Sequence, residues 1–205
     1  MISTPYPPSF VDRLMGSVQR LPVPYLLTYF LLFLFDSSLF HIVAWVDGWL
    51  PAYQVSRFAL MFPLWLWGPL AIMTYLNSVS VEALINFRPL VDIPDETMGR
   101  LKYEFTTMPA RAVILSSAIW SVVYVVFTFL ALDSMYATYG FGRLAEVTNV
   151  VRGWISFFIG SVFYYHTIRQ LRLVNRTLRK VKQFDLFQLE PVYAFSALTS
   201  RTGVS

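Results

Sequence analysis

The sequence predicts an all-α, polytopic membrane protein, built as a bundle of about four transmembrane helices with short interfacial and cytoplasmic helices. Hydrophobic residues make up 56% of its 205 residues and charged residues only 14%, against about 45–50% and about 25% in soluble domains. The apolar residues also gather into runs of about 20, which is the length a helix needs to cross a bilayer. Both observations favour a membrane bundle over a soluble domain.

Four apolar segments are long enough to cross a hydrocarbon core of about 30 Å as helices. We predict that they cover residues 21–46, 58–76, 112–132 and 150–168. The remaining residues form an N-terminal cytoplasmic or interfacial segment, a cytoplasmic loop, and a basic cytoplasmic helix with its tail: 1–20, 77–111 and 169–205. The fourth span is the least apolar, because Arg152 lies near its start.

The distribution of Lys and Arg predicts the orientation. Of these 16 residues, thirteen fall on the side of the two termini and three fall on the other side: Arg57, Arg143 and Arg152. Cytoplasmic loops of membrane proteins carry the excess of Lys and Arg. We therefore expect a multi-pass protein of the cell (cytoplasmic) membrane with both termini in the cytoplasm.

Two helix-start signals lie outside the spans. Ser9 followed by Asp12 resembles a capped helix start, and apolar residues recur at helical spacing from Phe10 to Leu21. This pattern predicts a short helix on the inner membrane surface. Pro94, with Asp95 and Glu96 after it, predicts a cytoplasmic helix whose first turn is acidic, as the helix dipole favours.

Four polar residues gather in the outer half of the first span: Asp36, Ser37, Ser38 and His41. An ionisable side chain at the centre of a bilayer costs at least about 2.5 to 3.5 kcal/mol and is a functional candidate. Asp36 and His41 are five residues apart, so they lie on different faces of a helix and need partners from other spans. We expect these partners at similar depth: Tyr124, Thr128 and Ser156.

Two interpretations of this cluster stay open. It forms a packed hydrogen-bond network or a water-exposed helix end, or it handles a proton, an ion or a ligand.

Five basic residues share one face of the helix that follows the fourth span: Arg169, Arg172, Arg176, Arg179 and Lys180. One interpretation is a topological stop signal that contacts anionic lipid headgroups, at about 1 kcal/mol for each basic residue. The other is a stalk that passes a signal to a partner, because Leu171, Val174, Leu178 and Val181 repeat at heptad-like spacing. No nucleic-acid-binding fold accompanies the charge, so we do not expect a nucleic acid as partner.

Small residues predict that the third and fourth spans touch. Ser156 and Gly160 are four residues apart in the fourth span, and the third span carries a similar series: Ala112, Ser116, Ser117 and Ser121. Such series let helix backbones approach closely in a membrane.

The sequence lacks the residues of several kinds of chemistry. It contains no cysteine, which excludes disulfides, thiolate nucleophiles, iron–sulfur clusters, zinc–thiolate sites and attached haem. His41 and His166 lie near opposite ends of their predicted spans, so they do not reach one haem iron from both sides. Motifs of zinc proteases, serine hydrolases and P-loop proteins are absent. We therefore expect no enzyme, metal or cofactor.

Thr106 to Arg111 (TTMPAR) and residues 185–203 (DLFQLEPVYAFSALTSRTG) resemble segments of uncharacterised bacterial multi-pass membrane proteins, over about a fifth of the chain. The resemblance implies a prokaryotic cytoplasmic membrane and brings no catalytic or binding residue. Our leading hypothesis is a non-enzymatic sensory or signal-transmitting membrane domain, with the lipid bilayer and a second copy or another membrane protein as partners. The alternative is a small transporter or channel subunit that handles protons or ions through Asp36 and His41.

Overall fold

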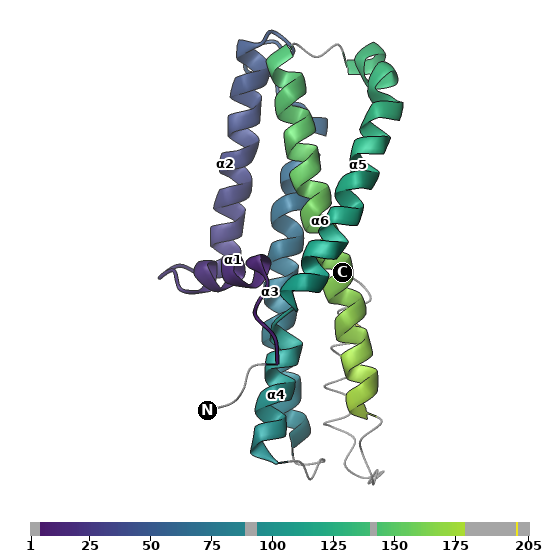
Figure 1. Ribbon diagram of the computed structural model, residues 1–205. Helices are drawn as coiled ribbons and strands as arrows, with labels where there is room; N and C mark the ends of the chain where they lie inside the picture. The colour runs from purple at the N-terminus through teal and green to yellow at the C-terminus, as the bar shows by residue number, and fades with distance from the viewer. Residues whose placement is uncertain (1–4, 89–93, 140–142, 179–199, 201–205) are drawn as a thin grey trace. The chain divides into compact units, whose positions relative to one another are not determined.

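The computed structural model describes residues 5–88, 94–139, 143–178 and 200, and these residues form six α-helices and no strand (Figure 1). The helices are α1 (Phe10–Gln19), α2 (Tyr25–Val46), α3 (Met61–Phe87), α4 (Asp95–Thr106), α5 (Ala110–Tyr139) and α6 (Arg143–Leu178). A short 3-10 helix, η1 (Phe58–Leu60), precedes α3. The prediction of an all-α chain is confirmed.

Three of these helices are long and apolar enough to cross a membrane, over Tyr25–Val46, Met61–Asn86 and Ala110–Ala131. The predicted count of four was therefore too high by this criterion. Residues 150–168 lie inside α6, and Arg152, Ser156, Ser161 and His166 lower the mean hydropathy of that stretch. Arg152, Ser156 and Ser161 form contacts inside the protein, as described below. In unit 1, His166 Nε2 lies 2.9 Å from Asn77 Oδ1.

Helix α3 continues well past residue 76, where the predicted second span ended. Its 27 residues correspond to about 40 Å at 1.5 Å per residue. The interval 77–111, predicted as a loop, therefore holds the last turns of α3 and all of α4. The reason is visible in the sequence, where Leu76, Val79 and Ala83 continue the apolar face of α3 into the core described next.

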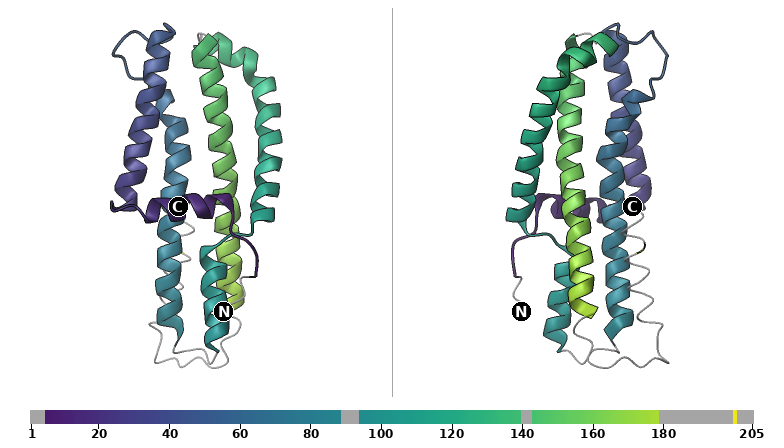
Figure 2. Two further views of the ribbon diagram at one scale, coloured as in Figure 1. Left: turned by 60° about the vertical axis from the view of Figure 1, so that its left-hand side comes forward. Right: turned by 90° about the vertical axis from the view of Figure 1, so that its right-hand side faces the viewer.

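The chain divides into two compact units, which are described separately. Unit 1 comprises Met1–Gly16, Ile72–Val113 and Phe163–Ser205. In it the C-terminal parts of α3 and α6 run alongside α4 (Figures 1 and 2). Eight buried apolar residues from these three helices form its core: Leu76, Val79, Ala83, Leu84, Leu101, Phe105, Leu173 and Val174.

Unit 2 comprises Ser17–Ala71 and Ile114–Val162. It contains α2, most of α5, and the N-terminal parts of α3 and α6, which run alongside one another (Figure 2). Large apolar side chains cover the outside of α2 and α5; Phe35 is 67% exposed and Leu130 is 82% exposed. Continuous apolar surface of this kind is rare on soluble monomers and is normal for helices that face lipid.

The helix ends follow the signals in the sequence. The Ser9 hydroxyl accepts a hydrogen bond from the Asp12 backbone N–H (3.1 Å), and the Asp12 carboxylate accepts one from the Ser9 N–H (2.9 Å), so the predicted cap of α1 is confirmed. Helix α4 begins directly after Pro94, as predicted. Helix α2 ends where Gly48 adopts a positive φ of 72°, a conformation that glycine takes without strain.

Candidate functional site

An arginine from α6 completes the polar cluster of α2 within unit 2. Arg152 Nη2 lies 3.0 Å from Asp36 Oδ1 and also donates to the Asp36 backbone carbonyl at 3.3 Å. Trp67 of α3 donates its indole N–H to Asp36 Oδ2 at 3.3 Å. Both carboxylate oxygens therefore have a donor, and the pair joins three helices.

The surroundings of the pair strengthen it. The side chains of Arg152 and Asp36 are 12% and 18% exposed, and the guanidinium carbon lies 4.5 Å from the centre of the Phe40 ring, on its face. An arginine that is shielded from solvent gains about 2 kcal/mol from such a cation–π contact. Removing one member of a buried ion pair leaves the other charge uncompensated, which costs about 3–5 kcal/mol. The pair is therefore a strong constraint on the packing of α2, α3 and α6.

His41 has its own partners and does not pair with Asp36. Its Nε2 accepts a hydrogen bond from the Ser56 backbone N–H (3.2 Å), so the ring proton belongs on Nδ1, which donates to the Ser37 carbonyl (2.7 Å). The ring is 5% exposed. Because both ring nitrogens are used, His41 fixes the segment before η1 onto α2.

The four predicted site residues therefore have different environments. Asp36 is in the ion pair, His41 and Ser37 are buried, and Ser38 is exposed. The Ser37 hydroxyl and Arg152 Nε are buried without a hydrogen-bond partner among the described residues.

Two of the three expected partners of the cluster form hydrogen bonds elsewhere. Tyr124 donates to the carbonyl of Val150 (2.9 Å), and Ser156 donates to the carbonyl of Phe62 (2.9 Å). Sequence reasoning missed Arg152 as the partner, although a signal was present: Asp36 is the only Asp or Glu, and Arg152 the only Lys or Arg, inside the four predicted spans. Two lone opposite charges in apolar segments favour each other as partners.

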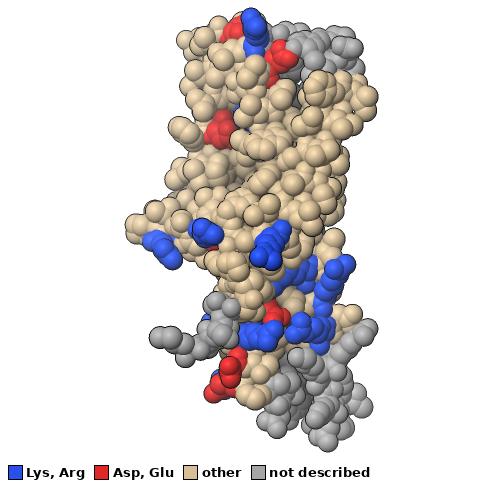
Figure 3. Space-filling view, in the orientation of Figure 1, with Lys and Arg blue, Asp and Glu red and all other residues tan. Residues whose placement is uncertain are grey.

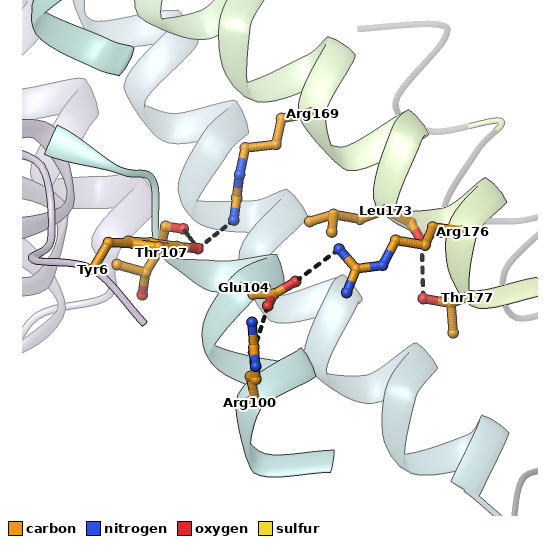
Figure 4. Close-up of polar contacts among 8 residues, drawn as sticks. All are labelled: Tyr6, Arg100, Glu104, Thr107, Arg169, Leu173, Arg176 and Thr177. Atoms are coloured by element: carbon orange, nitrogen blue, oxygen red, sulfur yellow. Dashed lines mark hydrogen bonds and ion pairs between the residues drawn. The ribbon is translucent and has the colours of Figure 1, made fainter. Parts of the chain in front are cut away.

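A second polar cluster, in unit 1, holds the N-terminal segment (Figure 4). Tyr6 donates its hydroxyl hydrogen to the carbonyl of Thr107 (3.0 Å) and accepts a hydrogen bond from Arg169. Tyr103 in turn donates to the Tyr6 carbonyl (2.7 Å). Burial raises the pKa of Tyr6 to about 12, although the positive charge of Arg169 opposes the rise. The Tyr6 hydroxyl therefore keeps its proton, and its hydrogen bond, at neutral pH.

Asp12, in the first turn of α1, also holds the N-terminal segment in place. Its Oδ2 accepts hydrogen bonds from the Ser9 hydroxyl (2.7 Å) and from the Met108 backbone N–H (2.9 Å). Pro8 and Pro109 form an antiparallel bridge beside it. Burial raises the pKa of the Asp12 carboxyl, and the hydrogen bonds from Ser9 and Met108 oppose that rise. Residues 106–111, which carry the TTMPAR motif, are thus the place where the N-terminal segment is bound.

The basic residues of α6 do not form one solvent-exposed face. Arg176 contacts Glu104 (3.6 Å), a 94% buried carboxylate that Arg100 also binds (3.0 Å), and Figure 4 shows both guanidinium groups directed at it. Arg169 is directed at Tyr6, whereas Arg172 is exposed. Arg179 and Lys180 lie outside the described residues. Figure 3 shows several Lys and Arg side chains on the surface of unit 1 that faces the viewer.

Helices α5 and α6 touch in unit 2. On α5 the contact uses Ser116 and Ser117 of the predicted series, whereas on α6 it uses Ser161 and Gly153 instead of Ser156 and Gly160. The hydroxyl oxygens of Ser117 and Ser161 lie 3.4 Å apart, and Gly153 lies against the ring of Tyr124. A Cβ at Gly160 would meet no atom within 4 Å. Gly153 was not in the predicted interface because it has no small residue four positions away in its own helix.

No protein-family model, no curated protein and no solved structure matches this chain. The resemblance to bacterial membrane proteins therefore stays a prediction. In the part of the chain that the structure describes, no three His, Asp or Glu side chains come together in a way that could hold a metal ion.

Proposed function

We propose that this chain is a non-enzymatic, multi-pass protein of the cytoplasmic membrane, with both termini in the cytoplasm, that senses or transmits a signal. The largely shielded Asp36–Arg152 pair carries this proposal. A charge pair that joins three helices defines one packing arrangement, and an event that separates the pair would favour another. The proposed signal is therefore a change in the packing of α2, α3 and α6.

We further propose that α6 is a fourth crossing, despite its lower hydropathy. Arg152 is the strongest argument against such a crossing, and its charge is compensated by Asp36 inside the protein. Ser156 and Ser161 also direct their hydroxyls at protein atoms. Polar residues in membrane helices face the bundle interior, so these contacts are what a crossing helix requires.

The Asp36 carboxylate already binds two donors, and this favours signal transmission over transport. A transported proton or cation would have to compete with a guanidinium at 3.0 Å and an indole donor at 3.3 Å. His41 is also fully used by Ser37 and Ser56. A small transporter or channel subunit remains the second candidate, because the Asp36 side chain keeps 18% exposure.

Cysteine labelling tests the topology without background, because the chain has no cysteine. Gln54→Cys, in the segment after α2, should react with a membrane-impermeant maleimide added outside intact cells. Glu96→Cys, at the start of α4, should react only after the cells are opened. The reverse pattern would overturn the proposed orientation, and labelling of both positions from one side would overturn the crossing by α3.

A second measurement separates signalling from transport. Asn175→Cys, an exposed position of α6, is labelled in the otherwise unchanged chain and in an Asp36→Asn background. Signalling predicts that the labelling rate changes by at least about fivefold, the lower end of typical coupling between sites. Transport predicts proton or ion flux into proteoliposomes that Asp36→Asn abolishes. An unchanged rate in an Asp36→Asn chain that stays folded would overturn the signalling proposal.

A further inference from the structure

Two exposed arginines of unit 1 lie beside the bridge between Pro8 and Pro109. Backbone hydrogen bonds on both sides of this bridge fix its pairing. Arg13 Nη2 lies 3.5 Å from the Pro8 carbonyl oxygen, so its guanidinium group is next to the bridge. Arg111 follows Pro109 by two residues in the chain. The bridge therefore brings together two cations from distant parts of the sequence.

The acid nearest to Arg13 in the sequence does not cancel this charge at the surface. Asp12 accepts hydrogen bonds at Oδ2 from the Ser9 hydroxyl (2.7 Å) and the Met108 N–H (2.9 Å), and its Oδ1 is buried. The surface around Arg13 and Arg111 is therefore positive. Guanidinium groups bind phosphate oxygens through paired N–H donors, which makes phosphate the anion that fits them well.

Apolar side chains are exposed next to the same arginines. Phe10 is 39% exposed and Leu14 is 40% exposed, and Phe10 lies one turn before both Arg13 and Leu14 on α1. Arg111 is the second residue of the apolar stretch Ala110–Ala131, so a crossing by α5 places it at the depth of the headgroups. Positive charge at this depth, beside apolar side chains, matches a phospholipid better than a free phosphate ion.

We propose that Arg13 and Arg111 together bind the phosphate of an anionic phospholipid in the inner leaflet. Phe10 and Leu14 contact the upper part of its acyl chains. Two guanidinium groups at one phosphate repel an ammonium group on the same headgroup, so the site prefers phosphatidylglycerol over phosphatidylcholine. The inference rests on the membrane placement proposed above and is independent of the proposed signalling role.

This proposal moves the contact with anionic lipid away from the basic residues of α6. Arg169 is directed at Tyr6 and Arg176 at Glu104, so both already have partners inside unit 1. Arg172, which is exposed, is the residue of that predicted face that competes with the new site in the test below.

The test uses the full-length protein in detergent, freed of lipid and given an equimolar mixture of phosphatidylglycerol and phosphatidylcholine with identical acyl chains. Native mass spectrometry at low ionic strength counts the bound lipids. We expect phosphatidylglycerol to exceed phosphatidylcholine by about two- to fivefold, the scale of a partly exposed ion pair. Inorganic phosphate should lower this ratio no more than sodium chloride of the same ionic strength does, because it has no acyl chain.

Charge variants locate the site. Arg13→Gln and Arg111→Gln should each lower the ratio, and the double variant should remove most of the preference. Arg111→Lys keeps the positive charge and should retain most of the preference, which separates a loss of charge from a loss of folding. Arg172→Gln is the matched control, because it removes an exposed arginine from α6.

A change to Phe10 tests the acyl-chain part of the proposal. Phe10→Gln should lower the binding of both lipids and leave their ratio unchanged. Val55→Gln is the control, since Val55 is an apolar residue that is 67% exposed in the segment after α2.

Four outcomes would overturn the lipid proposal: equal binding of the two lipids, an unchanged ratio in the double variant, a loss with Arg172→Gln as large as with Arg111→Gln, or specific displacement by inorganic phosphate. Failure of the membrane placement is recognised separately, because the chain would then leave the membrane fraction in an alkaline carbonate wash.

Discussion

The ring of Tyr124 lies so close to Gly153 that no side chain fits between them. A Cβ at position 153 would stand 2.3 Å from the Tyr124 hydroxyl oxygen and 3.0 Å from the ring carbon that bears it. The same hydroxyl donates to the carbonyl of Val150 at 2.9 Å. In unit 2 this contact sets how closely α5 and α6 approach each other.

Gly153→Ala should lower the free energy of unfolding by about 1–3 kcal/mol, because the added methyl group overpacks the contact with Tyr124. Gly160→Ala is the control in the same helix. Its added methyl meets nothing within 4 Å, and alanine favours a helix over glycine by up to about 1 kcal/mol. Denaturant unfolding of both variants in the same detergent measures the difference. Equal stabilities would contradict the close contact, and Tyr124→Phe should partly rescue Gly153→Ala.

The Asp36–Arg152 pair gives a second prediction. Arg152→Leu should cost about 3–5 kcal/mol of unfolding free energy, because it leaves the Asp36 carboxylate enclosed without its cation. Changing both residues to Leu removes both charges and should recover most of that loss. Arg143→Leu, at an exposed position of the same helix, should have little effect.

Unfolding of the single and double variants in one detergent measures this coupling. If the double variant lost the sum of the two single losses, the two charges would not be coupled.

The existence of the ion pair could have been predicted from the sequence, but its geometry could not. Asp36 and Arg152 are the lone acid and the lone strong base in the predicted spans. The length of a span gives the depth of a residue, whereas its neighbours depend on how each helix is rotated and packed. Only the three-dimensional structure therefore shows that Trp67 and Phe40 belong to the site. Tyr124 was expected to contact Asp36 because the two residues lie at similar depth, which does not fix how the helices are rotated.

Local signals predicted the helix starts better than apolar length predicted the helix ends. Ser9, Pro94 and their neighbours act through the backbone of their own helix, so the sequence is sufficient to locate these starts. The length of α3 depends instead on the core that Leu84 forms with Leu101 of α4. The apolar length of one segment gives no information about such a contact between distant residues. The predicted second span therefore ended at residue 76.

The buried carboxyl of Asp12 predicts a pH dependence of the bound N-terminal segment. Its folded-state pKa lies above the ordinary 3.8 because burial disfavours the charged form. The folded state then binds a proton more readily than the unfolded state does. Stability should therefore increase as the pH falls from above the raised pKa toward 3.8.

Hydrogen exchange measures this dependence, because the Met108 N–H is bonded to Asp12. The protection of Met108, corrected for the intrinsic exchange rate, should be greater at acidic pH than at neutral pH. Asp12→Asn should remove that dependence, because the amide does not titrate in this range. Greater protection at neutral pH would contradict the predicted direction.

Glu104 gives the last prediction, because it is 94% buried and receives two arginines from different helices of unit 1. Glu104→Gln removes the charge but keeps the shape of the side chain. Arg100 and Arg176 are 60% and 54% exposed, so solvent screens each pair and we expect a loss of about 1 kcal/mol.

Hydrogen exchange of α4 and of the C-terminal part of α6 should show this loss as faster opening, and added salt should reduce the difference from the unaltered chain. Glu96→Gln is the control, since Glu96 is exposed at the start of α4. If both variants exchanged alike, Glu104 would not hold α4 to α6, and the apolar core around Phe105 would carry that contact alone.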